Sequence, residues 1–345
     1  MSSGSEPVVP GARQALTIAQ IAQKAGVSVA TVSKVVNGRS DVAAETRGLV
    51  ENVIRQHGYR RQRRPAQPAP LLELVINRLR GEYAMEIIVG ADRVARDNNM
   101  AVSVTGHQGQ QTPGSNWIEG VLARRPAGVI AVFCTLTAAQ REQLRVRAIP
   151  LVEVDPVGEH GTDIPSVAAD GWHGGLAATQ HLLKLGHRRI GVIAGPDHLL
   201  AARVRVDGYR AAMDSAGAPI DAALIGEGTF QVQEGAEHAR RMLAMPIPPT
   251  AIFACSDQYA VGVYQTAFEL GVRIPQQLSV VGYDDIQPAA WLSPALTTVR
   301  QPMTDMAAEA ASMALRLARG ERLKRSRVVL ATELVVRAST APPGH

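Results

Sequence analysis

Residues 17–59 read TIAQIAQKAGVSVATVSKVVNGRSDVAAETRGLVENVIRQHGY, and their pattern predicts short helices joined by a tight turn. Thr17 and Gln20 have the three-residue spacing of a capping box at the start of the first helix. Apolar residues then recur at helical spacing until Gly26, which permits the reversal between two helices. Ser28 can cap the second helix. The stretch therefore predicts a helix-turn-helix unit.

The second helix of this unit has one apolar and one open face. Val32, Val35 and Val36 can pack against the other two helices, the third of which is expected over residues 45–57. The open face is left with small and basic side chains, namely Val29, Ala30, Ser33 and Lys34. A helix of this kind is suited to the major groove of DNA.

Residues 17–37 also match a known pattern. The run Thr17-Ile18-x-x-Ile21-Ala22-x-x-Ala25-Gly26-Val27-Ser28-x-x-Thr31-Val32-Ser33-x-Val35-Val36-Asn37 resembles, without a gap, the headpiece of the lactose/galactose repressor (LacI/GalR) family. The alternative is a small helical bundle that shares only its apolar spacing. The resemblance implies a transcriptional repressor that binds DNA.

DNA contacts are expected from the second helix and from residues near the starts of the helices. Val29 and Ala30 should approach base edges, Lys34 can donate to guanine, and Ser33 can reach a base or a phosphate. Residues suited to phosphate contact and register are Thr17, Thr31, Asn37 and Thr46, and Ser28 is also expected among the DNA-binding residues. Since Val29 and Ala30 have no hydrogen-bonding side chain, they would contact thymine methyl groups or follow the shape of the groove.

The segment after Tyr59 departs from the family. Members of the family usually continue with Pro-Asn-x-x-Ala-x-x-Leu, a hinge helix whose leucine enters the minor groove. This chain has Arg60-Arg61-Gln62-Arg63-Arg64-Pro65 instead. Our hypothesis is that Arg60, Arg61, Arg63 and Arg64 lie in or along the minor groove, which attracts arginine where it is narrow.

Charge is unevenly distributed along the 345 residues. Residues 16–64 carry nine lysines and arginines against three acids, a net charge of +6, whereas residues 65–345 carry −1. The positive charge therefore lies on the segment that is predicted to bind DNA, as counterion release from phosphates requires.

The remainder of the chain predicts an α/β fold. Short apolar runs alternate with amphipathic helical stretches, which is typical of parallel sheets covered by helices on both faces. Strands are expected at residues 72–77, 101–105, 128–133, 151–154, 189–194, 223–226, 251–254 and 279–283. Helices are expected at residues 84–97, 174–185, 202–216, 234–243 and 259–271. This number of strands favours two sheets over one.

This part of the chain also resembles the family's effector domain, which is similar to periplasmic sugar-binding proteins. The resemblance rests on segments such as Leu185-Gly186-His187-Arg188-Arg189-Ile190-Gly191, Arg205-Val206-Asp207-Gly208-Tyr209 and Ser279-Val280-Val281-Gly282-Tyr283-Asp284-Asp285. It implies two doubly wound parallel-sheet lobes, with crossovers near residues 167–170, 300 and 328–331. The expected domains are an arm (1–15), a DNA-binding domain (16–64), a Pro-rich linker (65–70) and an effector-binding and dimerisation domain (71–340). Its lobes are expected over 71–168 with 301–328, and over 169–300 with 329–340.

The resemblance places an effector between the lobes, where open α/β sheets bind small molecules. Asp155, Arg205 and Asp284 match positions that contact the effector in sugar-responsive members. Carboxylates accept hydrogen bonds from hydroxyls, and a guanidinium donates in a planar fork. The alternatives are a strand-end cap, a surface ion pair and a turn, respectively.

Other side chains are expected to complete this site. Phe230 and Trp172 can stack on a sugar ring, although both residue types are commonly part of a core. Polar lining is expected from Asn77, Tyr83, Ser256 and Gln301. A purine is the main rival ligand, but this chain has Leu199 and Ala201 where the purine repressor has polar contacts.

The sequence predicts a binding protein and no enzyme. It contains no phosphate loop, no HExxH and no GxSxG motif. Two distant cysteines and nine histidines show no metal-ligand spacing, so we expect neither metal nor cofactor. A homodimer on pseudo-palindromic double-stranded operator DNA is expected, with a carbohydrate effector and no membrane.

Two other classes of protein remain as alternatives. A secreted sugar-binding protein would need a signal peptide, which residues 1–15 do not resemble, and no headpiece. A sugar-modifying enzyme would need an acid/base pair or a phosphate loop. The expected location is therefore the cytoplasm, in association with the nucleoid.

Overall fold

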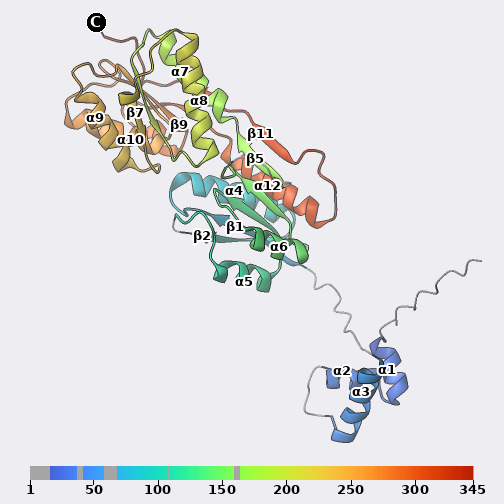
Figure 1. The fold of residues 1–345 in the computed structure, drawn as a ribbon. Coiled ribbons are helices and arrows are strands. Elements are labelled where there is room, and N and C mark those ends of the chain that lie inside the picture. The colour runs from blue at the N-terminus through green and yellow to red at the C-terminus, as the bar shows by residue number, and fades with distance from the viewer. Residues whose placement is uncertain (1–15, 37–41, 58–67, 108, 159–163, 345) are drawn as a thin grey trace, which may run out of the picture. The chain divides into compact units, whose positions relative to one another are not determined.

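The computed structural model describes residues 16–36, 42–57, 68–107, 109–158 and 164–344 (Figure 1). The chain divides into two compact units, Met1–Gln67 and Pro68–His345. Several predictions lie outside the described residues, namely those for the arm 1–15 and for Asn37, Arg60, Arg61, Arg63 and Arg64.

The first unit contains the predicted helix-turn-helix. Its helices are α1 (Ile18–Ala25), α2 (Val29–Val36) and α3 (Ala44–His57). The capping box is formed, since the Thr17 hydroxyl accepts from Gln20 N at 3.3 Å and Gln20 Oε1 accepts from Thr17 N at 2.9 Å. Gly26 ends α1 with φ of 66°, a left-handed conformation that glycine adopts without strain. Ser28 Oγ accepts from Thr31 N at 3.1 Å and caps α2.

A small core holds the three helices together. It consists of Ile21, Ala22, Val32, Val35 and Val50, all buried. Burying each large apolar side chain stabilises the fold by about 1.5–3 kcal/mol. All three helices contribute such side chains to this core. On α2, Val29, Ala30 and Lys34 are exposed, whereas Val36 packs against this core.

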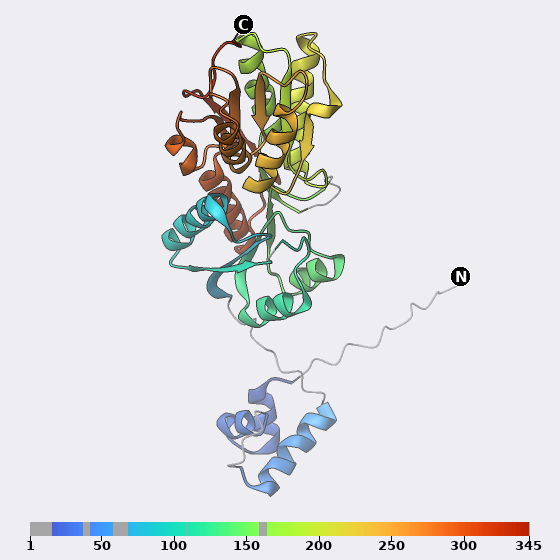
Figure 2. The ribbon, with the colours of Figure 1, turned by 90° about the vertical axis from the view of Figure 1, so that its left-hand side faces the viewer.

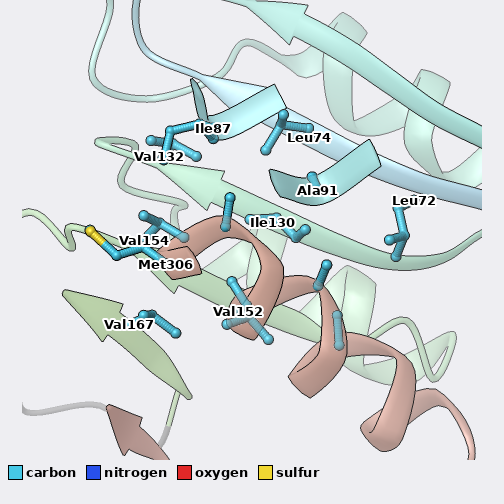
Figure 3. Close-up of a cluster of buried hydrophobic side chains, with 14 of the residues drawn as sticks. Leu72, Leu74, Ile87, Ala91, Ile130, Val132, Val152, Val154, Val167 and Met306 are labelled. Carbon is cyan, nitrogen blue, oxygen red and sulfur yellow. The ribbon is translucent and has the colours of Figure 1, made fainter. Parts of the chain in front are cut away.

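The second unit begins with a lobe built on a six-stranded parallel sheet, in the order β11-β5-β4-β3-β1-β2. Its strands are β1 (Ala69–Ile76), β2 (Ala101–Gly106), β3 (Pro126–Val132), β4 (Leu151–Val154), β5 (Ser166–Ala169) and β11 (Arg327–Leu330). Its helices are α4 (Gly81–Asp97), α5 (Ser115–Arg124), α6 (Ala138–Val146) and α12 (Met303–Ala318). Helices α4 and α12 cover one face, where Leu72, Leu74, Ile130 and Met306 meet in the core (Figure 3). Helices α5 and α6 cover the other face.

The second lobe has a sheet in the order β12-β10-β9-β8-β6-β7, parallel except for β12. Its strands are β6 (Ile190–Ala194), β7 (Ile225–Glu227), β8 (Ala251–Ala254), β9 (Ser279–Asp284), β10 (Thr297–Arg300) and β12 (Glu333–Val335). Its helices are α7 (Gly171–Lys184), α8 (Leu200–Ser215), the 3-10 turn η1 (Ala222–Leu224), α9 (Val232–Leu243), α10 (Asp257–Glu269) and α11 (Gln287–Trp291). Helices α7 and α8 cover one face, and α9 and α10 the other. The C-terminus lies on this lobe (Figure 2).

Three short segments carry the chain between the lobes. Residue 170 joins β5 to α7, residues 301–302 join β10 to α12, and residues 331–332 join β11 to β12. Because α12 packs on the first sheet and β12 on the second, each lobe contains segments that are far apart in the sequence. The fold class predicted from the sequence is confirmed.

The three segments lie side by side. Asp170 N donates to Leu330 O at 2.8 Å, and the Thr332 hydroxyl donates to Asp170 O at 3.1 Å. Arg300 pairs with Glu333 at 3.2 Å across β10 and β12. The crossovers therefore form one hydrogen-bonded hinge.

Some boundaries differ from the prediction. Strand β1 begins at Ala69, inside the expected linker, because Ala69 N already donates to Arg125 O at 2.9 Å. Val329 and Leu330 pair with β5 in the first sheet, although the first lobe was expected to end at residue 328. The strand expected at 223–226 begins only at Ile225, because η1 occupies the residues before it.

One buried charge interrupts the apolar pattern of β1. The carboxylate of Glu73 is fully buried and accepts from the Thr105 hydroxyl at 3.0 Å and from Arg124 at 2.8 Å. Removing either partner of such a pair would leave a costly unpaired group, so the pair fixes α5 against the sheet.

Candidate functional site

A cavity of about 620 Å³ lies between the two lobes of the second unit. Its lining comes from the loops that follow β1, β2 and β3 in the first lobe and β6, β7, β8 and β9 in the second. All these loops leave the carboxyl ends of their strands. A volume of this size suits a ligand of one or two sugar rings or of drug-like size.

Arg205 lies in the wall of this cavity and is only 3% exposed. It is held by α8, and its Nη1 donates to Cys255 O at 2.7 Å and lies 3.5 Å from Asp284 Oδ1. The guanidinium lies over the Tyr283 ring at 3.9 Å. Its Nε–H finds no acceptor among the described residues. Since buried donors are normally paired, this N–H is a ready contact for a ligand oxygen.

Asp284 is the last residue of β9 and lines the same cavity. Its Oδ1 accepts from Gln301 Nε2 at 2.6 Å, so a residue of the hinge holds the carboxyl in place. Burial raises the pKa of Asp284 to about 6, although Arg205, Gln301 and Ser256 oppose the shift. The group is therefore ionised at neutral pH and available to accept hydrogen bonds.

Asp155, which follows β4, is buried behind the cavity wall. It accepts from the Tyr83 hydroxyl at 2.7 Å. Burial raises the pKa of Asp155, and the hydrogen bond from Tyr83 opposes that rise. Tyr83 itself lines the cavity, so Asp155 fixes the direction in which the phenol presents its oxygen.

A carboxylate that the sequence prediction missed supports this wall from behind. Asp257, at the start of α10, is fully buried, and its two oxygens accept from Ile286 N at 2.9 Å and from the Thr298 hydroxyl at 2.6 Å. Burial raises the pKa of Asp257 well above its usual value. Asp284 and Asp285 both have positive φ, at 114° and 55°, so the loop needs such support.

An aromatic ring forms another part of the wall in the second lobe. Phe230 has φ of 63°, and its N–H donates to the Tyr259 hydroxyl at 2.7 Å. The ring packs 5.7 Å from that of Tyr259, centroid to centroid, and close against Gly195. A Cβ at Gly195 would lie 2.1 Å from Phe230, so only glycine leaves room for the ring here.

The remaining predicted residues are divided between the cavity and other places. Asn77 and Ser256 line the cavity, and Gln301 lies behind Asp284. Trp172 does not belong to the lining. It lies at the start of α7, 38% exposed, with its ring edge-on to His173. Since Trp172 is not among the residues that line the cavity, its position does not support the stacking role predicted for it.

Several lining residues went unnoticed in the sequence. Arg78, Arg80, Gln111, His198, Gln231 and Gln258 contribute polar groups to the cavity. Within the part of the chain that the structure describes, no carboxylate pairs with Arg78 or Arg80. The sequence signal for Arg78 and Arg80 was their position shortly after the buried strand β1. The amide and guanidinium groups give the cavity many donors, which suits a ligand rich in oxygen atoms.

The first unit presents its own candidate surface on α2. Val29 is 53% exposed, and Ser28, Ala30 and Lys34 are exposed beside it. Ser33 is half-buried on the same helix. Thr17, Thr31 and Thr46 lie at or near helix starts, where backbone N–H groups favour phosphate. This face has the size and the chemistry of a groove-binding surface.

Neither a metal site nor a membrane-spanning helix lies among the described residues. No group of three or more histidine, cysteine or acidic side chains there is arranged to hold a metal ion. In the same residues, none of the helices has the length and apolar character that crossing a bilayer requires.

Comparison with known families gives one match in each of the two compact units. Residues 17–62 match the family described as bacterial regulatory proteins, lacI family, and residues 179–340 match a periplasmic binding protein-like domain. The HTH-type transcriptional repressor PurR of Pasteurella multocida (strain Pm70) is 30% identical over 334 residues, which cover 94% of this chain and 98% of that protein. The ribose operon repressor of Escherichia coli (strain K12) is 30% identical over 333 residues, with 94% and 99% covered.

Solved structures agree with these matches. The transcriptional regulator CelR in complex with cellobiose is 29% identical, with a TM-score of 0.72 and coverage of 94% of this chain and 99% of that one. The lac repressor dimer bound to operator and the anti-inducer ONPF is 26% identical, with a TM-score of 0.69 and coverage of 95% and 100%.

Proposed function

The chain belongs to the LacI family of bacterial regulatory proteins, and we propose that it represses transcription until a mono- or oligosaccharide binds between its lobes. As a member of this family it binds operator DNA, forms dimers and responds to a small-molecule effector. The nature of the effector and the residues that contact it are the proposal.

The observation that carries the proposal is the chemistry of the cavity wall. Arg205 has a free buried donor, Asp284 is a hydrogen-bond acceptor, and Phe230 offers a ring face. A sugar combines hydroxyls that donate, oxygens that accept and an apolar ring face. These three features match the acceptor Asp284, the donor Arg205 and the aromatic ring of Phe230, respectively.

A purine effector is the second candidate, favoured by the similarity to PurR. A planar base would need hydrogen-bonding groups along its edge, and Leu199 and Ala201 offer none from their side chains. The similarity to CelR, which was solved with cellobiose, supports the saccharide. We also propose that the effector is bound and released unchanged, with no turnover.

We assign base contacts on the operator to Val29, Ala30, Ser33 and Lys34. Their positions on the outer face of α2 support this assignment. Phosphate contacts are assigned to Thr17, Ser28, Thr31 and Thr46. The DNA-binding domain is proposed to extend to residue 64 and the effector domain to begin at β1.

The experiment that tests the effector class is a thermal-shift screen of the full-length dimer. Mono- and disaccharides, nucleosides and nucleobases are each added alone and together with operator DNA. A saccharide at 100 times its Kd should stabilise the effector domain by about 2.7 kcal/mol, and nucleobases should leave it unchanged. The same saccharide should release operator DNA and be recovered intact.

Stabilisation by a nucleobase and by no saccharide would replace the first candidate with the second. Chemical conversion of the saccharide during incubation would contradict a purely regulatory role. By linkage, a saccharide that releases DNA must bind more weakly to the DNA complex than to the free protein.

The response to the effector is expected to depend on pH through Asp284. Its pKa is raised by burial to about 6, so effector hydroxyls lose a charged acceptor as the pH falls through that value. Effector affinity should fall by up to about tenfold per pH unit below about 6. Calorimetric titrations with the effector between about pH 5 and 8 would measure this fall in affinity.

Unfolding cannot account for such a loss, because the stability effect has the opposite sign. A carboxyl whose folded pKa is raised binds a proton more tightly in the folded state, so its contribution to stability increases as the pH falls from about 6 towards about 4. The variant Asp284→Asn should bind more weakly at all pH values and show a flat profile. A profile in that variant as steep as in the unaltered protein would rule out Asp284 as the titrating group.

A further inference from the structure

The loop between α12 and β11 concentrates positive charge on the first lobe (Figure 1). Residues 319–327, which comprise this loop and the first residue of β11, read RGERLKRSR, with five basic residues against one acid, a net charge of +4. Residues 65–345 carry −1 in total, so outside this loop the same part of the chain carries −5. A basic segment in an otherwise acidic domain calls for a specific explanation.

Three of the five basic side chains of this loop are exposed and unpaired among the described residues. Arg322, Lys324 and Arg325 are exposed, and within the described ranges none of their side chains has an ion pair or hydrogen bond. Other arginines near this edge of the sheet have partners that explain them, since Arg124 pairs with Glu73 and Arg145 with Glu142. The loop residues therefore differ from the basic side chains that commonly end helices.

The loop is nevertheless anchored. Leu323, in its middle, packs against the core of the first lobe. Arg316 Nε pairs with Glu321 at 3.0 Å, and its Nη2 donates to Arg322 O at 3.5 Å. Anchored in this way, Arg322, Lys324 and Arg325 project from a fixed backbone.

The sheet topology places this loop at the edge where the chain arrives from the helix-turn-helix. All six strands of the first sheet are parallel, so the starts of β11, at Arg327, and of β1, at Ala69, lie at the same edge. Four strand spacings separate them, about 19 Å. The chain therefore enters the first lobe at the same edge of the sheet as the one that carries the loop.

We propose that the loop 319–327 binds the DNA backbone, through Arg322, Lys324 and Arg325, as a second contact surface beside the headpiece. Three exposed cations on a fixed loop fit phosphates, which bind through charge and carry no sequence information. The loop would add affinity for any duplex that extends beyond the headpiece contacts. It would not alter sequence preference.

The test compares two triple variants of the full-length protein. The first carries Arg322→Gln, Lys324→Gln and Arg325→Gln. The matched control carries Lys184→Gln, Arg210→Gln and Arg273→Gln, which remove three exposed charges from the second lobe and change the net charge equally. Binding to a long duplex of arbitrary sequence and to operator DNA is measured by fluorescence anisotropy between about 50 and 200 mM salt.

The loop variant should lose about 2 to 3 from the slope of log K against log salt for each protomer, on both duplexes. The control should keep the slope of the unaltered protein, and both variants should keep its effector affinity and melting temperature. Equal slopes for the two variants would overturn the proposal, and capture of an acidic protein by the loop would then be the competing explanation. Failure of the unaltered protein to bind any duplex would overturn it together with the DNA-binding function.

Discussion

Replacing Arg205 with alanine is expected to abolish the response to the effector while operator binding persists. The side chain is almost fully buried in the cavity wall, and its Nε–H has no acceptor among the described residues. A hydrogen bond from a charged group contributes about 1.5–3 kcal/mol, and the ligand would lose more than one such donor. We expect effector affinity to fall at least about 100-fold, as measured by calorimetric titration.

The same substitution leaves Asp284 without its nearby cation. Breaking a buried charge pair costs about 3–5 kcal/mol, so the effector domain should melt at a lower temperature. Headpiece binding to operator DNA does not use Arg205, and anisotropy titrations should give operator affinity close to that of the unaltered protein. Operator release by the usual effector concentration in Arg205→Ala would refute this assignment.

Two further variants separate charge from geometry. Arg205→Lys keeps the positive charge but loses the planar fork, so it should recover most of the stability and little of the effector affinity. Arg210→Gln removes an exposed arginine from the same helix, whose partner Asp207 is also exposed. It should leave both properties unchanged, since surface ion pairs contribute little.

Replacing Gly175 with valine should produce the largest loss of stability. Helices α7 and α8 meet there backbone to backbone, and a Cβ at Gly175 would lie 2.0 Å from the carbonyl oxygen of Arg205. Gly208 makes the reciprocal approach, 2.2 Å from Trp172 O. Backbone cannot move aside as a side chain can, so we expect a loss of about 3 kcal/mol or more and a fall in melting temperature of about 6–12 °C.

Gly114→Ala is the matched control for this prediction. Gly114 precedes α5 with φ of −70°, and nothing lies within 4 Å of an added Cβ. Its melting temperature should stay within about 2 °C of that of the unaltered protein, since surface changes away from such contacts stay within about 0.5 kcal/mol. Equal melting temperatures for the two glycine variants would show that α7 and α8 can separate without loss.

The helix-turn-helix was predictable because its determinants are local. Thr17 and Gln20 are three residues apart, and Gly26 needs no distant partner to adopt its left-handed conformation. The order of the strands in the two sheets was harder to predict from the sequence. Strands β11 and β12 are short, and their pairing depends on partners more than thirty residues away, such as β5 and β10.

Some of the important polar residues could likewise be predicted from the sequence, and others could not. Arg205 and Asp284 were predicted because they match positions that contact the effector in members of the family that the sequence resembles. Asp257 was missed because its partners, Ile286 and Thr298, are 29 and 41 residues distant and become neighbours only in the folded lobe. Glu73 was missed because a binary pattern assigns a strand interior to apolar residues.

The hinge of three adjacent crossovers bears on the entropy of effector binding. A single flexible crossover would let the lobes twist and slide as well as close, and a ligand would have to suppress all those motions. Here, Asp170, Thr332 and Leu330 join two of the crossovers by hydrogen bonds, and Arg300 and Glu333 connect the third. Relative motion of the lobes is thereby restricted largely to closure, so binding sacrifices little conformational freedom. A ligand as small and well hydrated as a sugar can then shift the equilibrium with only a few hydrogen bonds.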